Sequence, residues 1–396
     1  MTRPAALAAG RDTVSESATL PAGAHLSLVT SAAGLAALAA EWKRLEDMTA
    51  NPLIVFQSHD WLCAWSGVYA ASSNNAEPLI VTGYSGGDLV FAMPLVRTIR
   101  KGVRMARWLS DPFAQYGDIV LAKGYCPRQW VSAAIVFLKQ IKGIDLLWLR
   151  YVRNDAALQP FAEENMRKAQ LSEKAAWLDL TQYTDEAAYD ARYTSAQRKR
   201  RKKIRKELET MGAVEFTHLP PGPASALALN QAFAEKNAWL EERARQNRVI
   251  GCPHHAAFLK RLQKSSLDVV VTEMTAGGKP VSWEIGLRYR GHHFAYITSH
   301  VNALTDLSPG RLHMDLSQRL ALRDGMKAFD LMIPYDPHKE SWSSATMGTE
   351  DYYVPLTAKG QLFGRAYLEN VRPFLRKTYY SAPESLRRLA KPIFGL

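Results

Sequence analysis

Cysteine is scarce in this chain of 396 residues, and its three cysteines, Cys63, Cys126 and Cys252, lie far apart. An odd number of distant cysteines gives neither a disulfide framework nor the spacing of metal ligands. The pattern therefore predicts a reducing cytoplasmic location and no metal site. The sequence also lacks an apolar run as long as a membrane span. The alanine-rich stretch after Arg3 is too short and too weakly apolar for a secretory signal.

Several catalytic signatures are also missing from the sequence. It has no His-Glu-x-x-His zinc motif, no Walker A phosphate loop, no Rossmann glycine fingerprint and no Gly-x-Ser-x-Gly elbow. These absences argue against the enzyme classes that use those motifs. No alternative catalytic set therefore competes with the residues described below.

Basic side chains outnumber acidic ones. The chain has 50 lysines and arginines against 38 aspartates and glutamates, for a net charge of +12. This charge favours a negative partner, which can be a phosphorylated cofactor, an anionic membrane surface or nucleic acid. Hydrophobic residues make up 47% of the sequence, and a chain of this length suits two domains with real cores.

The stretch from Asp268 to Trp342 is the most informative part of the chain. It begins with three segments rich in β-branched and aromatic residues: Val269–Met274, Val281–Tyr289 and His292–His300. Glycines separate these segments and suit tight hairpin turns. The sequence therefore predicts an antiparallel meander, with Phe294, Tyr296 and Thr298 on one face of its last strand by alternation.

A helix is predicted after the turn Ser308-Pro309-Gly310. Ser308 suits the N-cap and Pro309 the first helical position, where a missing N–H costs nothing. Leucines recur at helical spacing until Gly325, and 329–333 reads as a short buried strand. A helix N-terminus that follows such a turn offers N–H groups and a positive dipole end to an anion. The alternative is an ordinary capped helix.

The first half of the chain has a similar order of elements. Strands are predicted at 26–29, 79–82, 89–96, 119–121, 146–150 and 177–180, and helices at 35–45, 59–69, 128–139 and 156–169, with an irregular loop at 108–118. The aromatic pair Trp61 and Trp65 reads as core. We therefore expect an α+β fold of two similar tandem domains, 25–182 and 183–360, each a mixed sheet flanked by helices. Residues 1–24 are expected to be disordered, and the tandem arrangement suits a monomer.

Two basic segments have several readings. Residues 195–211 form a helix with Ser195 as a plausible N-cap, a narrow apolar seam and a basic exterior. This exterior suits a solvated or membrane-facing surface, an acidic substrate or, less well, nucleic acid, because no aromatic residues are interleaved for stacking. The tail 361–396 mixes basic and large apolar residues, which suits an interfacial helix on anionic lipid or packing against the protein.

The order of these motifs resembles the acyltransferase domain of the CelD/BcsL branch of the GNAT superfamily. The matching features are Gly278 with Pro280-Val281, Ser308-Pro309-Gly310, Gly325, Phe329-Asp330, and Tyr335 with Lys339 and Trp342. Upstream, Phe56-Gln57-Ser58, Trp61, Trp65, Pro94-Leu95 and the basic helix extend the resemblance to about 26–356. Two departures are Val301-Asn302, where members often have an acidic residue, and a Tyr-Lys pair that is spread from Tyr335 to Lys339.

The resemblance implies tandem GNAT-like domains and an acyl-CoA or acetyl-CoA donor. The donor diphosphate would lie at the N-terminus of the second-half helix, and main-chain N–H groups of the last meander strand would polarise the thioester. The implied donor-binding residues are Ile297, Ser299, Pro309, Gly310, Arg311 and Leu312, with Arg319 as a further cation. Glu284 and His300 are the first candidates for the base and Asp306 is the third, although each can equally have a structural role.

Further site residues follow from the same resemblance. Tyr335 would protonate the leaving thiolate, and Lys339 would meet an anionic group. The helix at 224–246 would form a wall of the acceptor pocket, so that the implied acceptor contacts are Lys236, Asn237, Trp239, Arg243 and Trp342. Surface ion pairing is the alternative for the charged members of this set.

The expected activity is N-acylation of an amine on a cell-envelope molecule, at the cytoplasmic side and in peripheral contact with an anionic membrane. An amino sugar of an exported polysaccharide is the first acceptor, and a long-chain lipid amine such as a sphingoid base is the second. A FemABX-type transferase, which uses charged tRNA, and a non-catalytic sensor of an anionic ligand are the other readings. Nucleic acid is otherwise not expected as a partner.

Overall fold

The computed structural model of the protein describes residues 20–49, 51–70, 76–243, 247 and 249–382. Most of the N-terminal stretch that we expect to be disordered, and the tail beyond residue 382, lie outside the described residues. No described helix is both long and apolar enough to cross a bilayer.

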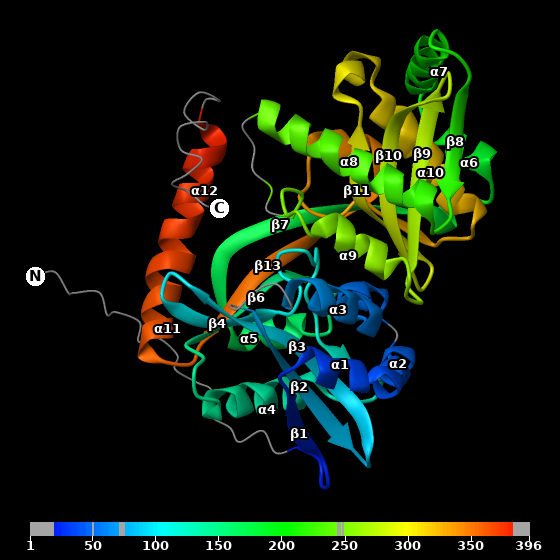
Figure 1. The fold of residues 1–396 in the computed structure, drawn as a ribbon. Helices are drawn as coiled ribbons and strands as arrows, with labels where there is room; N and C mark the ends of the chain where they lie inside the picture. Colours follow the sequence, from blue (N-terminus) through cyan, green and yellow to red (C-terminus); the bar gives the residue numbers. More distant parts are fainter. Residues whose placement is uncertain (1–19, 50, 71–75, 244–246, 248, 383–396) are drawn as a thin grey trace, which may run out of the picture.

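One continuous mixed sheet runs through the described molecule (Figure 1). Its order is β1-β2-β3-β4-β6-β13-β7-β12-β11-β10-β9-β8, and β5 pairs with β3. The strands are β1 (His25–Val29), β2 (Glu77–Ser85), β3 (Asp88–Arg100), β4 (Val103–Trp108), β5 (Val120–Leu121), β6 (Leu146–Arg153), β7 (Arg167–Asp179), β8 (Val214–Leu219), β9 (Asp268–Ala276), β10 (Lys279–Tyr289), β11 (His292–His300), β12 (Ala328–Asp330) and β13 (Ala345–Pro355). The predicted meander is β9-β10-β11.

The last strand crosses between the two halves of the chain. β13 lies between β6 and β7 and is antiparallel to both. β7 in turn pairs at its end with β12. The C-terminal half therefore supplies a strand to the sheet of the N-terminal half, and the two halves share one hydrogen-bonded sheet.

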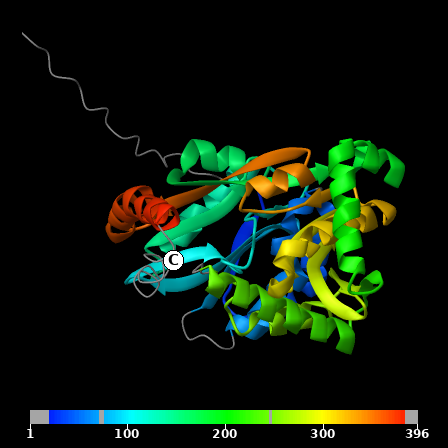
Figure 2. The same ribbon diagram turned by 90° about the horizontal axis from the view of Figure 1, so that it is seen from above.

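Helices cover both faces of this sheet (Figure 2). They are α1 (Ala32–Ala37), α2 (Ala39–Met48), α3 (His59–Trp65), α4 (Pro127–Gln140), α5 (Gln159–Asn165), α6 (Glu186–Ala191), α7 (Ser195–Glu209), α8 (Pro223–Glu242), α9 (His255–Leu262), α10 (Pro309–Arg323), α11 (Ala358–Phe363), the π-helix η6 (Gly364–Val371) and α12 (Arg372–Ser381). In the C-terminal half, α8 and α10 both contact β10 and β11, and α6 and α7 contact α10.

Aromatic side chains join the two halves in one core. Phe56 packs edge-on against Phe294 at 6.3 Å, and Trp61 packs against Phe258 at 4.8 Å. Trp61 and Trp65 are both buried, as their spacing predicts. Edge-to-face pairs of this kind add stabilisation beyond the area that they bury. The halves are therefore held together by side-chain packing as well as by the sheet.

A β-bulge interrupts β11. Ile285 lies opposite Ile297 and Leu287 lies opposite Phe294, so two residues of β11 face Gly286 alone. Because opposite residues share a face, Phe294 lies on the same face as Ile297, and the predicted common face for Phe294 and Thr298 is wrong. A Cβ on Gly286 would lie 2.6 Å from the His293 ring, which explains the glycine.

Other local predictions also need correction. The predicted helix at 156–169 is only α5, because the chain already enters β7 at Arg167. The predicted loop after 107 overlaps the end of β4. Thr194, and not Ser195, caps α7, in a capping box with Gln197. Ser308 precedes α10 as predicted, but it is left-handed (φ 53°, ψ 45°) and its side chain makes no cap hydrogen bond.

Candidate active site

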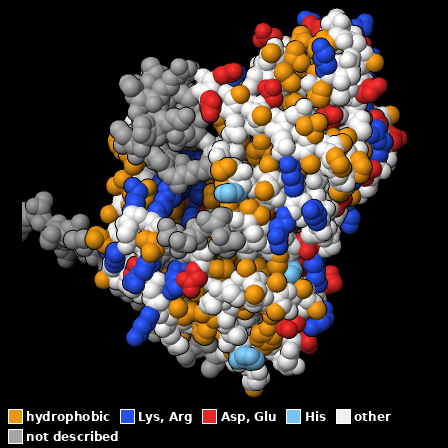
Figure 3. Space-filling model, in the orientation of Figure 1, with side chains coloured by type: hydrophobic (Ala, Val, Ile, Leu, Met, Phe, Trp, Pro, Cys, Tyr) orange, Lys and Arg blue, Asp and Glu red, His pale blue; other side chains and the backbone are white. Residues whose placement is uncertain are grey.

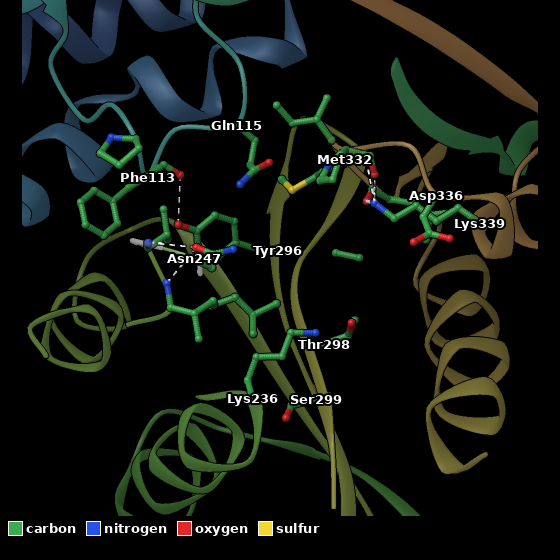
Figure 4. A pocket seen from close by; sticks show the side chains of 18 of the residues that line it. Phe113, Gln115, Lys236, Asn247, Tyr296, Thr298, Ser299, Met332, Asp336 and Lys339 are labelled. Carbon is green, nitrogen blue, oxygen red and sulfur yellow. Dashed lines mark hydrogen bonds between the residues drawn. The ribbon is translucent and has the colours of Figure 1, made fainter. Parts of the chain in front are cut away.

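A cavity of about 1360 Å³ lies where the two halves meet (Figure 4). Its walls come from β11, the segment after β12, the first turn of α10, α8, the loop around Phe113 and Gln115, and α12. These elements belong to both halves of the chain. Figure 3 shows basic side chains around the hollow on this face of the molecule.

The cavity begins where β11 and β12 separate. The two strands pair in parallel only at His292–Ala328, His293–Phe329 and Phe294–Asp330. Beyond these pairs, 295–300 of β11 and 331–334 after β12 both line the cavity. The bulge lies at this point, and bulges often re-aim strands at functional sites. The separated strand edges leave room for an extended ligand that hydrogen-bonds to the main chain.

The N-terminus of α10 forms another wall. Ser308, Gly310 and Arg311 line the cavity, whereas Pro309 and Leu312 do not. A Cβ on Gly310 would lie 3.6 Å from His300 Nδ1. Burial, and then the charges of Arg200 and Arg201, lower the pKa of Arg311. The end of α10 therefore combines the positive end of a 15-residue helix with a crowd of arginines, and both favour an anion.

Ser299 offers a further sign of a ligand. Its Oγ atom is buried and has no hydrogen-bond partner within the described part of the chain, although Ser299 lines the cavity. Buried polar atoms in folded proteins are normally paired. Ser299 and Ile297, both predicted to contact the donor, are thus placed where a ligand between the strands would touch them.

The three predicted bases are placed differently. His300 lines the cavity with its Nε2 3.3 Å from Thr305 Oγ1. Burial, and then Lys236 and Arg243, lower its pKa, so that the imidazole is neutral at pH 7. Glu284 does not line the cavity; it lies 2.6 Å from His293 Nε2. Burial acts to raise the pKa of Glu284, but His293 leaves it below its usual value. Asp306 also lies off the cavity wall.

Lys339 lines the cavity but is engaged by the chain itself. Its Nζ donates to the carbonyls of Leu331, Met332 and Pro334 at 2.8, 2.9 and 2.8 Å, and burial lowers its pKa to about 8. An ammonium group has three donors, and all three are used. Lys339 therefore holds the segment after β12 at the cavity wall, and Figure 4 shows its side chain beside Met332.

The remaining predicted residues divide into two groups. Lys236 and Trp239 on α8 line the cavity, as does Trp342, whereas Asn237, Arg243 and Tyr335 do not. Arg243 instead stacks on Trp239 at 4.6 Å. The predicted cation Arg319 lies elsewhere and bonds Asp315 and Glu186 at 2.9 and 3.0 Å.

Sequence reasoning missed several cavity residues. Tyr296, beside the bulge, has its hydroxyl 3.0 Å from the Phe113 carbonyl and 3.1 Å from His255 Nε2. Burial lowers the pKa of His255 to about 4, and its Nδ1 lies 2.8 Å from the Val249 carbonyl oxygen. Gln115 joins from the other half. These contacts span distant segments, so that no local pattern in the sequence signals them.

One family model and several solved structures are similar to this chain. Residues 195–340 match a family model described as an acetyltransferase (GNAT) domain. No curated protein matches the chain. The solved structure of FemX is similar at 9% identity and a TM-score of 0.53, over 77% of this chain and 93% of that one. The C-terminal domain of a proposed lysylphosphatidylglycerol synthetase from Agrobacterium fabrum is similar at 11% identity and a TM-score of 0.52, over 85% and 96%.

A tandem GNAT protein from the clavulanic acid biosynthesis pathway also matches, at 12% identity and a TM-score of 0.47, over 84% of this chain and 99% of that one. At such identities the likeness concerns the fold. The fold is α+β with two tandem GNAT-like domains, as the sequence predicts. The matched acetyltransferase domain over residues 195–340 makes the protein an acyltransferase of the GNAT type.

Proposed function

We propose that the protein transfers an acyl group from acyl-CoA to an amine of a cell-envelope molecule. The observation that carries the proposal is the opening between β11 and β12, which leads to the N-terminus of α10. Bound acyl-CoA would supply the acyl thioester. The finer assignment to the CelD/BcsL branch, with an amino sugar of an exported polysaccharide as acceptor, is supported by the resemblance of the motif order.

Different residues of the cavity would have different roles in the acyl transfer. The N–H groups at the start of α10 and the Arg311 guanidinium would bind the donor diphosphate. Main-chain N–H groups near the bulge, between Tyr296 and Ser299, would polarise the thioester carbonyl. His300, neutral at pH 7, would accept the proton of the amine directly or through one water. Lys236 and Trp239 would contact the acceptor.

The donor site can be tested by calorimetric titration with acetyl-CoA and palmitoyl-CoA. In Gly310→Glu, a carboxylate enters the proposed diphosphate site, and we expect binding to weaken at least tenfold. Ala224→Glu is a matched control, because Ala224 is the second residue of α8 after Pro223, is exposed and lies off the cavity. Equal binding by the wild type and Gly310→Glu, or no binding of either thioester, would refute the donor assignment.

A second candidate is aminoacyl transfer from charged tRNA, in the manner of FemABX-type enzymes. It is favoured by the outer face of α7, where Arg198, Lys199, Arg200, Lys202 and Lys203 follow one another with only Arg201 turned inward, its side chain 13% exposed. RNA binding by a basic face weakens steeply as salt rises. Purification at low salt and measurement of the absorbance ratio at 260 and 280 nm distinguishes the two donors. Co-purifying RNA favours tRNA, whereas protein free of RNA that binds CoA favours acyl-CoA.

A further inference from the structure

Arginines crowd the end of the cavity that the N-terminal half and α12 provide. Five of them line it: Arg100, Arg107, Arg150, Arg372 and Arg376, which are together called the arginine cluster here. They come from β3, β4, β6 and α12. The donor site proposed above, at the start of α10, uses none of them.

The three inner arginines share two buried aspartates. Arg107 Nη1 and Arg150 Nη1 donate to the two oxygens of Asp111 at 2.5 and 2.8 Å. Arg372 Nη1 donates to Asp351 at 3.1 Å, and Arg150 Nε lies 3.5 Å from the same carboxylate. Three cations thus face two anions, whose side chains are 3% and 2% exposed. One positive charge therefore remains in excess in a part of the cavity wall whose charged side chains are mostly buried.

The pKa values of the arginines differ: burial acts to lower the pKa of Arg150, but the charges of Asp111 and Asp351 raise it above its usual value. Burial, and then the Arg150 charge, lower the pKa of Arg372 to about 10. Burial acts to raise the pKa of Asp111, but Arg150, Arg107, Arg372 and Arg100 together hold it below its usual value. A buried guanidinium whose charged form is disfavoured is stabilised by an added anion. The planar guanidinium fork matches the oxygens of phosphate.

We propose that the arginine cluster binds a phosphate ester or diphosphate on the amine acceptor. The acceptor would then be a phosphorylated amine, held through its phosphate at one end of the cavity while its amine reaches the opening between β11 and β12. This inference rests on the proposed acyltransferase function. The phosphate can come from a soluble sugar phosphate or from a lipid, because both present the same oxygens.

Arg107→Gln tests the cluster with little risk to folding, because it removes the excess charge and leaves Asp111 with Arg150 and Asp351 with Arg372. Inorganic pyrophosphate is titrated into protein saturated with CoA, which fills the donor site. We expect pyrophosphate affinity to fall about tenfold or more in Arg107→Gln. Arg97→Gln is the matched control on β3; Arg97 pairs with Glu77 and lies off the cavity, so its affinity should stay within about twofold of wild type.

The source of the phosphate is distinguished by competition. Glucosamine 1-phosphate that displaces pyrophosphate indicates a soluble acceptor, whereas phosphatidylethanolamine in detergent micelles that displaces it indicates a lipid one. Displacement by neither probe, or equal affinity in Arg107→Gln and wild type, overturns the inference. If Arg107→Gln does not fold by circular dichroism, Arg100→Gln takes its place with the same expected loss, because Arg100 is a partly exposed member of the same cluster.

Failure of the inference can be told apart from failure of the proposed function. CoA binding without an arginine-dependent pyrophosphate site leaves the acyltransferase proposal standing and removes the acceptor phosphate. Arginine-dependent pyrophosphate binding without CoA binding does the reverse: the anion site exists, and the donor assignment is wrong.

Discussion

Single residues decide which histidine of the cavity can exchange a proton. His313 is held between Thr272 Oγ1 and Ser282 Oγ, each at 2.8 Å, and burial lowers its pKa to about 4. His338 is exposed and pairs with Asp336 at 2.8 Å. All three histidines line the cavity, but it is the His300 ring that faces the Gly310 turn, and burial lowers its pKa. It is therefore the residue on which the pH dependence should depend.

The pH profile of His300→Gln provides the test. Because the pKa of His300 is lowered from 6.5, its neutral form prevails at pH 7, and wild-type kcat/KM should fall only as the pH drops below that lowered pKa. Glutamine keeps a hydrogen-bonding group near Thr305 but cannot titrate. We expect a loss of about 100-fold in kcat at pH 7 and no acidic limb of this origin. An unchanged acidic limb in the variant would exclude His300 as the base.

Lys339→Ala tests a different residue-scale role. The variant leaves three main-chain carbonyls without their donor, so the free energy of unfolding should fall by about 3 kcal/mol and turnover should fall with it, without loss of the fold. Urea titration and a transfer assay measure the two effects. Lys359→Ala is the control, because Lys359 is exposed and bonds one carbonyl, that of Gly102. Wild-type turnover in Lys339→Ala would remove this residue from the site.

At the scale of elements, the sequence predicts what local patterns encode. The meander β9-β10-β11 follows from its glycine turns, and α10 follows from leucine spacing between Pro309 and Gly325. The bulge in β11 does not, because alternation continues in the sequence while the pairing slips by one residue at Gly286. Serine is a common N-cap residue, but Ser308 has a left-handed backbone and its side chain makes no cap hydrogen bond.

The candidate site was also predictable only where a local pattern in the sequence encodes it. Gly310, Arg311, Ile297 and Ser299 adjoin the predicted turn and strand, and they line the cavity. Glu284 instead lies on a buried face of the sheet, where it contacts His293, and no local pattern in the sequence predicts this contact. No local pattern in the sequence predicts the arginine cluster, because only the tertiary fold brings β3, β4, β6 and α12 together.

At the scale of the whole molecule, Asp330 links the halves. On β12, it accepts hydrogen bonds from Tyr116 and from Arg153 of the N-terminal half, both at 2.8 Å, and its side chain is 4% exposed. The shared sheet and these buried bonds favour one cooperative unit. The sequence suggests two domains, but strand pairing between residues nearly 200 positions apart cannot be read from periodicity.

Urea unfolding tests this unit. We expect fluorescence and far-ultraviolet circular dichroism to report one coincident transition, because the sheet joins both halves. Asp330→Ala should lower the free energy of unfolding by about 3 kcal/mol, since it removes the buried carboxylate that pairs with the buried Arg153 guanidinium. Asp155→Ala is the control, because Asp155 is the outer, 41% exposed partner of the same arginine, and about 1 kcal/mol or less is expected there. Two separate transitions would contradict a single unit.

The position of β13 also sets the order in which the chain can be completed during synthesis. β6 and β7 leave the ribosome early, yet the strand that lies between them ends only at Pro355. Until then, the facing edges of β6 and β7 are unpaired, and unpaired edges attract other chains. The N-terminal half therefore cannot finish folding ahead of the C-terminal half, and a nascent chain that stalls before residue 345 should be prone to aggregate.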